Sequence, residues 1–321
     1  MRNLWKYKKL FLIAFLLCLY GYPELRCENI LSENLFCIGI DTLSETISSS
    51  VSSAKDEIIS EIKGSSVNSI NYTRFAIVSG GLLGLGTAVH FYELNAWWKN
   101  WRRPFHFQED LVYGKNVDKV GHAWDAAFSA YILSKSYRWT GFTEEKSVWI
   151  GAIGGSLFLL FVEIEDGYSQ WGFDRVDAAA DIAGGFYPLV QYYVPEFKNI
   201  ELKASYYPRQ YGKAGNIPGQ KHTIIDDYEG QTFWLSFKTG KLFPQIFPKF
   251  LNISIGYSVR NMNDLSKQYG VWLIAPDFDF SEIIPQSSGL LRTISEGLDY
   301  FKFPTPAVQI SPRVIWFGLY Y

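Results

Sequence analysis

The sequence predicts an α+β protein: an N-terminal bundle of about four helices, membrane-proximal or embedded, followed by an antiparallel β-rich domain. Long, mostly uncharged segments fill residues 67–196, whereas apolar and polar residues alternate with a period of two through 197–321. Of the 321 residues 48% are hydrophobic, enough for a sizeable core. Aromatic residues are frequent at 17% and charged residues sparse at 19%, a composition that fits a membrane interface. The formal net charge of −2 carries no basic surplus, so we expect no nucleic-acid partner.

Residues 1–27 are expected to form a signal peptide. Basic residues precede an apolar run at 10–19 that is too short to span a membrane. An uncleaved anchor is the alternative. Cys18 lies in the apolar run, but the residues before it lack the small side chains of lipoprotein processing sites. The following segment, 28–66, is rich in serine, and we expect it to be an arm or linker.

Four helical segments are expected in the bundle, at about 71–98, 118–138, 144–166 and 174–194. The first reaches the length of uncharged sequence that a spanning helix needs, the third and fourth fall just short, and the second is too polar. Two pairs of glycines four residues apart favour close helix contacts: Gly80 with Gly84, and Gly151 with Gly155. Tryptophans and arginines at 97–103 are typical of an interfacial anchor. A soluble bundle is the alternative.

Five or six strands are expected after the bundle. Alternation is clearest at about 200–207, 232–237, 252–259, 272–280 and 314–321, and a helix is expected over 289–301. The smallest transmembrane barrels use eight strands. We therefore expect a small sheet packed on the helices, unless further strands are present.

Ionisable residues at helical spacing are the most informative feature for function. Asp118, Lys119 and His122 begin the second helix, Glu163 and Asp166 end the third, and three acids share one stripe of the fourth, namely Asp174, Asp177 and Asp181. Carboxylates this close are stable only near water, near a cation or with a shared proton. If the three helices meet, all eight side chains gather at one end of the bundle.

Three interpretations of this cluster compete. It can be a structural network that fixes helix register and caps helix starts. It can be an acid–base or phosphate-handling site in which His122, Glu163 and Asp177 are catalytic and the other five residues bind. It can also hold a divalent cation through His122, Glu163, Asp177 and Asp181, a ligand set that suits Mg²⁺, Ca²⁺ or Mn²⁺ better than Zn²⁺. The other histidines, His90, His106 and His222, are expected to be packing or surface residues.

The polar elements occur in an order that resembles a known family. Val-Asp-Lys-Val-Gly-His at 117–122, Glu-Ile-Glu-Asp-Gly at 163–167 and Asp-Ala-Ala-Ala-Asp-Ile-Ala-Gly at 177–184 resemble the bacterial YfiM-like family of predicted periplasmic lipoproteins. They are more distantly similar to VanZ-like membrane proteins, which usually have Asn where this chain has Asp181. Longer family members also resemble this chain at Tyr207-Pro208 and in the run 226–234. The resemblance implies an envelope location and a membrane-proximal helical domain, and it implies no activity.

The sequence thus predicts an exported, envelope-associated protein, at the outer membrane or its periplasmic face rather than the inner membrane or the cytoplasm. The leading hypothesis is a structural or lipid-interacting protein with membrane lipid as its partner. The alternative is a membrane-proximal metal-dependent or acid–base enzyme that acts on lipid-linked or phosphorylated substrates.

Overall fold

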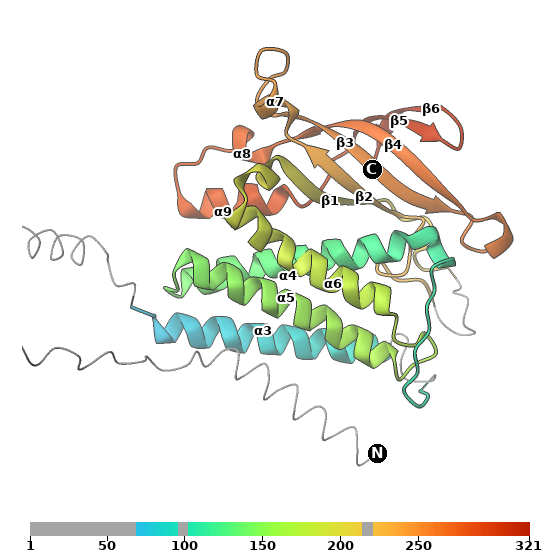
Figure 1. The fold of residues 1–321 in the computed structure, drawn as a ribbon, viewed down its shortest axis with the longest axis horizontal. Helices are drawn as coiled ribbons and strands as arrows, with labels where there is room; N and C mark the ends of the chain where they lie inside the picture. The colour runs from blue at the N-terminus through green and yellow to red at the C-terminus, as the bar shows by residue number, and fades with distance from the viewer. Residues whose placement is uncertain (1–68, 96–101, 214–220) are drawn as a thin grey trace, which may run out of the picture. The chain divides into compact units, whose positions relative to one another are not determined.

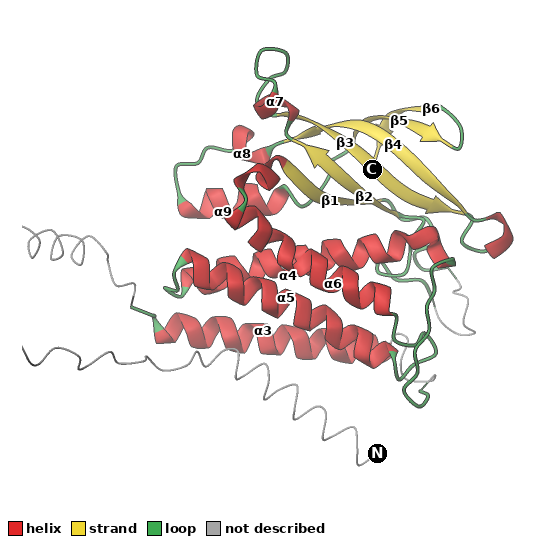
Figure 2. Cartoon of the chain, viewed as in Figure 1, coloured by secondary structure: helices red, strands yellow, loops and turns green. Residues whose placement is uncertain are grey.

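The computed structural model describes residues 69–95, 102–213 and 221–321. The expected signal peptide, the serine-rich arm and the tryptophans at 97, 98 and 101 lie outside these ranges. The chain divides into two units, Met1–Ile70 and Asn71–Tyr321, and the second contains every described helix and strand. In that unit the long helices come first along the chain and form one layer, and the antiparallel sheet follows and forms a second layer (Figures 1 and 2). The predicted α+β class is therefore confirmed.

Four long helices form the bundle: α3 (Tyr72–Glu93), α4 (Val117–Trp139), α5 (Glu144–Asp166) and α6 (Arg175–Tyr193). Three of them begin at a side chain that caps the first turn. Asn71 accepts from the backbone N–H of Arg74, and Thr143 accepts from that of Lys146. Asp174 caps α6. The predicted bounds of α5 agree with the structure, and those of α4 and α6 are displaced by one residue at each end.

Small residues bring α4, α5 and α6 into close contact. A Cβ atom on Gly151 would lie 2.3 Å from the carbonyl oxygen of Ala130, and one on Gly155 would lie 2.7 Å from the Ala130 nitrogen. On α6, Gly184 is equally tight against Ala123, where a Cβ atom would lie 2.0 Å from a carbonyl oxygen. The close approach predicted for the pair Gly151 and Gly155 is therefore present, and it sets the positions of the three helices that carry the polar cluster.

Helix α3 packs differently. A Cβ atom added to Gly80 or to Gly84 would have no described atom within 4 Å, so these glycines make no close helix contact in the described part of the chain. Ile77 and Leu85 are 61% and 62% exposed. By length and composition, two of the described helices, Tyr72–Tyr92 and Glu144–Asp166, are apolar enough to cross a membrane. The apolar window of the second is 39% buried within the protein, whereas that of the first is not buried at all.

The sheet has six strands in sequence order, all paired antiparallel: β1 (Ile200–Tyr206), β2 (Gln231–Phe237), β3 (Leu251–Arg260), β4 (Tyr269–Phe278), β5 (Thr305–Ser311) and β6 (Ile315–Tyr320). Short helices α7 (Thr239–Leu242) and α8 (Phe280–Ile283), and the longer α9 (Gly289–Leu298), connect them. Strand β5 is the one that the alternation pattern missed. Phe280, expected at the end of a strand, lies in α8 instead.

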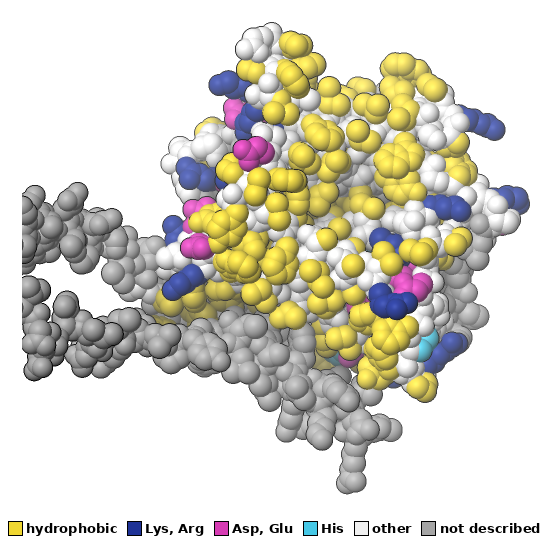
Figure 3. All heavy atoms as spheres, in the orientation of Figure 1, with side chains coloured by type: hydrophobic (Ala, Val, Ile, Leu, Met, Phe, Trp, Pro, Cys, Tyr) yellow, Lys and Arg dark blue, Asp and Glu magenta, His cyan; other side chains and the backbone are white. Residues whose placement is uncertain are grey.

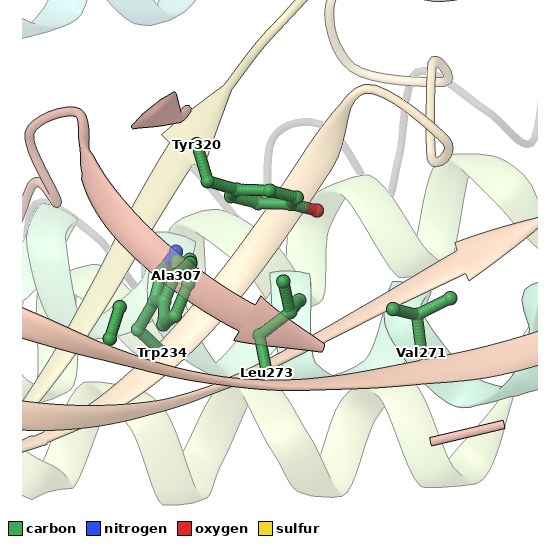
Figure 4. Close-up of a cluster of buried hydrophobic side chains, with 6 residues drawn as sticks. Trp234, Val271, Leu273, Ala307 and Tyr320 are labelled. Atoms are coloured by element: carbon green, nitrogen blue, oxygen red, sulfur yellow. The ribbon is translucent and has the colours of Figure 1, made fainter. Parts of the chain in front are cut away.

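The sheet curves so that one face is enclosed. Trp234 on β2 meets Tyr320 on β6 at a ring distance of 5.9 Å, although three strands separate them in the sheet order. Their cluster of buried apolar side chains, which includes Leu273, is drawn in Figure 4. The same face buries charge. Lys203 is fully buried and donates to the carbonyl oxygen of Phe278 at 2.8 Å, with the Asp277 carboxylate 2.9 Å away.

The opposite face of the sheet packs on α4 along one part and is exposed along another. Phe233 and Val259 pack with Val117 of α4, and Trp124 of the same helix donates its indole N–H to the carbonyl oxygen of Tyr300 at 2.9 Å. Elsewhere this face carries a row of apolar residues that oppose one another across neighbouring strands: Leu235, Ile255, Ile274, Val308 and Trp316. Apolar side chains are spread widely over the surface in Figure 3.

Candidate functional site

A pocket of about 500 Å³ lies between the bundle and the β-rich part of the unit. We call its lining residues from α4 to α6 the helical wall, and those from 221–231 the loop wall. The helical wall contains Asp118, His122, Asp125, Glu163, Asp166, Asp174 and Asp177. The predicted gathering of the polar residues at one end of the bundle is therefore what the structure has. Of the eight predicted site residues, only Lys119 and Asp181 do not line the pocket themselves.

His122 is held by Asp181 and faces Glu163. Its Nδ1 lies 2.9 Å from Oδ1 of Asp181, and its Nε2 lies 3.6 Å from Oε1 of Glu163. Burial opposes a charge on His122, but the hydrogen bond to Asp181 and the nearby carboxylates raise its pKa well above the usual value. The sequence pattern predicts that His122 can pair with Glu163 or Asp177, and the structure has the Glu163 pair. The closer contact, which the pattern did not predict, is with Asp181, one helical turn after Asp177.

Burial dominates the electrostatics of the acids. It raises the pKa of Glu163 to about 9 and that of Asp177 to about 7. Asp174 behaves differently, because it accepts from the backbone N–H groups of Val176 at 2.7 Å and Asp110 at 3.0 Å. Burial raises its pKa, but these hydrogen bonds and Lys119 outweigh that effect and hold the pKa of Asp174 well below the usual range.

Lys119 neutralises the other half of the cluster. Its Nζ is in hydrogen-bond contact with Asp110 and lies 3.1 Å from Oδ2 of Asp174 and 3.2 Å from Oδ1 of Asp177. Arg175, the first residue of α6, points elsewhere: its side chain is 70% exposed and pairs with Glu109 at 2.5 Å. Among the described residues, the acids around His122 and Lys119 therefore outnumber the cations that contact them.

Within the polar cluster of the bundle, two buried carboxylate oxygens have no hydrogen-bond partner among the described residues: Oδ1 of Asp177 and Oδ2 of Asp181. Asp177 is only 4% exposed and lines the pocket, and its Oδ1 meets Lys119 as an ion pair without hydrogen-bond geometry. Buried oxygens without donors are costly, and a cation or a proton would satisfy them.

The arrangement offers ligand sets for a metal ion. Three groups have potential ligand atoms within 4.8 Å of one another: Asp118 with His122 and Asp177, His122 with Glu163 and Asp181, and Asp110 with Asp174 and Asp177. Asp181 occupies Nδ1 of His122, which leaves Nε2 for an ion, and a carboxylate in that position orients a histidine ligand. Several carboxylates with one imidazole suit Mg²⁺ or Mn²⁺.

The loop wall was missed by the sequence interpretation. His222, expected to be a packing or surface residue, lines the pocket together with Lys221 and Asp226, and its Nδ1 lies 2.9 Å from Oδ2 of Asp226. Tyr228 joins the two walls, because its hydroxyl donates to Oδ1 of Asp118 at 2.6 Å. The only sequence signal for the histidine was the carboxylate four residues later. Asp110, also missed, comes from a loop without periodicity.

Asp227 holds the loop wall in place. It is fully buried, and its Oδ2 accepts from the Tyr206 hydroxyl at 3.0 Å and from the backbone N–H groups of Arg209 and Tyr211 at 2.9 and 3.1 Å. Its Oδ1 accepts from the N–H of Gly230 at 3.0 Å. Three consecutive residues therefore have separate tasks: Asp226 holds His222, Asp227 fixes the backbone, and Tyr228 reaches the helical wall.

Comparison with known proteins finds a similarity to one family over part of the chain. The model of a family described as "Predicted periplasmic lipoprotein (DUF2279)" matches residues 106–192, which contain the whole helical wall. This match supports the expected resemblance to predicted periplasmic lipoproteins. It fits an exported protein of the cell envelope, outside the cytoplasm and associated with a membrane. No curated protein and no solved structure matches the chain.

Proposed function

We propose that this chain is an exported envelope protein that binds a divalent cation on the helical wall. His122 supplies Nε2, Glu163, Asp177 and Asp118 supply carboxylate oxygens, and Asp181 orients the imidazole. The observation that carries the proposal is the geometry of His122, which is fixed through Nδ1 at 2.9 Å while its other nitrogen faces a carboxylate in an open pocket. The pocket beside this ring, together with the buried oxygens of Asp177 and Asp181 that lack hydrogen-bond partners, favours a bound cation over a purely structural network.

The structural interpretation suits one half of the cluster. Lys119 and Asp174 are fully engaged with each other, with helix-capping N–H groups and with Asp110, and they hold α4 and α6 in register. In the half around His122, the imidazole itself is the group among the described residues that can carry a positive charge, and it faces both Asp181 and Glu163. The excess of carboxylates in this half makes either protonation or a bound cation necessary, and the raised pKa of Asp177 reflects this.

A cation in this position supports chemistry on a substrate. It stabilises negative charge on an anionic group and lowers the pKa of a bound water. Glu163 and His122 are the neighbouring groups that can take or give a proton. We therefore favour a membrane-proximal, metal-dependent enzyme that acts on phosphorylated or lipid-linked substrates of the envelope, as a YfiM-like protein of the outer membrane or its periplasmic face.

Binding of Mn²⁺ to the purified full-length protein tests the proposal. Titration calorimetry of the wild type should show a saturable site, and Glu163→Gln and His122→Gln should each weaken it by about tenfold or more. Glu296→Gln, which alters an ion pair with Lys135 away from the pocket, is the matched control and should bind normally. Absence of Mn²⁺, Mg²⁺ and Ca²⁺ binding to the folded wild type would leave the structural network as the better account.

A second candidate function, direct contact with lipid, rests on α3 and the sheet. The exposed side chains of Ile77 and Leu85, and the apolar row across β2 to β6, are surfaces that a bilayer would cover. The purified protein should float with phosphatidylglycerol–phosphatidylethanolamine vesicles, and the double variant Ile77→Glu with Leu85→Glu should float less. Complete release of the native protein from envelopes by carbonate would contradict an embedded location.

A further inference from the structure

The two walls of the pocket differ in charge. Acidic residues dominate the helical wall, whereas the loop wall contributes Lys221 and His222, both of which line the same space. Lys221 is exposed, and His222 is only 9% exposed. Asp226 also lines the loop wall, but its two oxygens are engaged by His222 and Thr223. A ligand in this pocket therefore meets a cation-binding surface on one side and donor groups on the other.

His222 is fixed in place before any ligand arrives. Its backbone N–H donates to the carbonyl oxygen of Lys213 at 3.0 Å, and its own carbonyl oxygen accepts from Gly212 at 2.8 Å. The side chain is fixed as well, because Nδ1 lies 2.9 Å from Asp226, whose other oxygen accepts from the Thr223 hydroxyl at 2.7 Å. Nε2 is therefore the ring nitrogen that can meet a ligand. Because the ring is already fixed, little side-chain conformational entropy is lost when a ligand binds.

We infer that the pocket binds a phosphate-type oxyanion between a cation on the helical wall and the Lys221–His222 pair on the loop wall. The inference rests on the proposed cation site, since the carboxylates alone would repel an anion. With a divalent cation in place, one oxygen of the phosphate would meet the metal, and the others would accept from Nζ of Lys221 and from Nε2 of the His222 imidazolium. A volume of about 500 Å³ leaves room for more than the phosphate group.

The remaining lining residues indicate two sources of such a phosphate. Phe158 and Val162 of α5 and Val89 of α3 line the pocket too, beside the acids. An acyl chain or other apolar group attached to the phosphate would cover them. A phosphorylated lipid headgroup therefore gains contacts that free phosphate lacks, and the two sources predict different affinities for the same charged site.

The experiment measures phosphate binding to the full-length protein loaded with Mn²⁺. Inorganic phosphate and dihexanoyl phosphatidic acid below its critical micelle concentration are titrated separately. The variants Lys221→Met and His222→Phe should each weaken both ligands by about tenfold, the loss expected when one hydrogen bond to a charged group is removed. Mn²⁺ affinity in the same variants should stay at the wild-type value. His106→Gln, outside the pocket lining, is the control.

The possible outcomes distinguish failure of the inferred phosphate binding from failure of the proposed cation site. Binding of either phosphate probe with the expected losses supports the inference, and tighter binding of the phosphatidic acid assigns the source to lipid. Normal Mn²⁺ binding without phosphate binding, or phosphate affinity unchanged in Lys221→Met and His222→Phe, overturns the inference alone. If no divalent cation binds to the wild type, the proposed function and the inference both fail. Because Lys221 is exposed, Lys221→Met decides the matter even if His222→Phe does not fold.

Discussion

Asp181 on α6 and His122 on α4 are joined by a hydrogen bond of 2.9 Å between Oδ1 and Nδ1, beside a close contact between these helices. The contact is tight because Gly184, one turn after Asp181, rests against the backbone of Ala123, next to His122. Helix packing by small residues thus places an acid directly behind an imidazole, and the ring can only present Nε2 to Glu163 and the pocket.

Asp181→Asn should lower both cation affinity and stability. The amide keeps the shape and an acceptor for Nδ1, but it removes the charge that makes the imidazole a stronger ligand, so Mn²⁺ affinity should fall about tenfold. Unfolding stability should also fall, because the buried imidazole loses its charged partner and Oδ2 of Asp181 is replaced by an amide NH2 group that has no acceptor there. Calorimetry and thermal denaturation measure the two effects, with exposed Asp264→Asn as control. Unchanged Mn²⁺ affinity in Asp181→Asn would show that Asp181 does not act through His122.

The glycines of the bundle give a paired test of packing. Gly155→Ala should lower the free energy of unfolding by about 1–3 kcal/mol, because a Cβ atom there would lie 2.7 Å from the backbone nitrogen of Ala130, which has no room to move. Gly84→Ala on α3 meets no described atom and should leave stability unchanged or raise it by about 0.5–1 kcal/mol. Guanidinium unfolding followed by tryptophan fluorescence compares them, and equal effects would contradict the observed packing.

Local patterns predicted those parts of the fold that local interactions form. The cap at Asp174, the glycines at 151 and 155 and the acids at helical spacing are properties of single helices, and these elements occur as expected. Strand β5 was missed because Pro306 and Gln309 interrupt its alternation, and its pairing with β4 brings together residues about 35 positions apart in sequence, such as Ile274 and Val308.

The candidate site also has one part that local sequence patterns predict and another part that they do not. The helical wall follows from periodicity, since Asp118 and His122 share a face of α4. Glu163 pairs with His122 as the pattern allowed. The hydrogen bond from Asp181 did not follow from the pattern, because Asp177 and Asp181 lie on the same stripe of α6 and only the three-dimensional packing selects Asp181. The loop wall gave no periodic signal at all. His222 reaches the pocket through a turn fixed by Asp227, and that arrangement depends on contacts with Tyr206, Arg209, Tyr211 and Gly230.

Asp227→Ala should destabilise the loop wall strongly. It removes the acceptor of one hydroxyl and three backbone N–H groups in a fully buried position, which we expect to cost about 2–4 kcal/mol of unfolding free energy. Limited proteolysis should then cut within 207–230 faster than in the wild type. Phosphate binding should weaken as His222 loses its position, while Mn²⁺ binding by the helical wall persists. If the Asp227→Ala variant resists proteolysis as well as the wild type does, this role of Asp227 is contradicted.

Lys302 gives the sheet interior a specific pH dependence. Its Nζ donates to the carbonyl oxygen of Phe303 at 3.1 Å and lies 5.0 Å from the ring centre of Trp234, with Asp277 of β4 and Lys203 of β1 as the charged groups that face it. Burial lowers the pKa of Lys302 from 10.5 to about 8. Between these values the unfolded chain binds more protons than the folded one, so the contribution of Lys302 to stability rises with pH and is complete above 10.5.

Lys302→Met should remove the free-energy cost of burying the charged Lys302 side chain. Below pH 8 the folded protein holds a charged ammonium in a buried site, at a cost of about 3 kcal/mol when the shift is taken at full value. Methionine fills similar space, and Thr305 keeps its hydrogen bond to the carbonyl oxygen of Pro276 at 2.9 Å. The variant should therefore be more stable than the wild type at pH 7, and the difference should shrink steadily from about pH 8 to 10.5. Urea unfolding at pH 7, 9 and 10 measures it, with exposed Lys249→Met as the control. A difference that stays constant over this range would show that the Lys302 ammonium is stabilised where it lies.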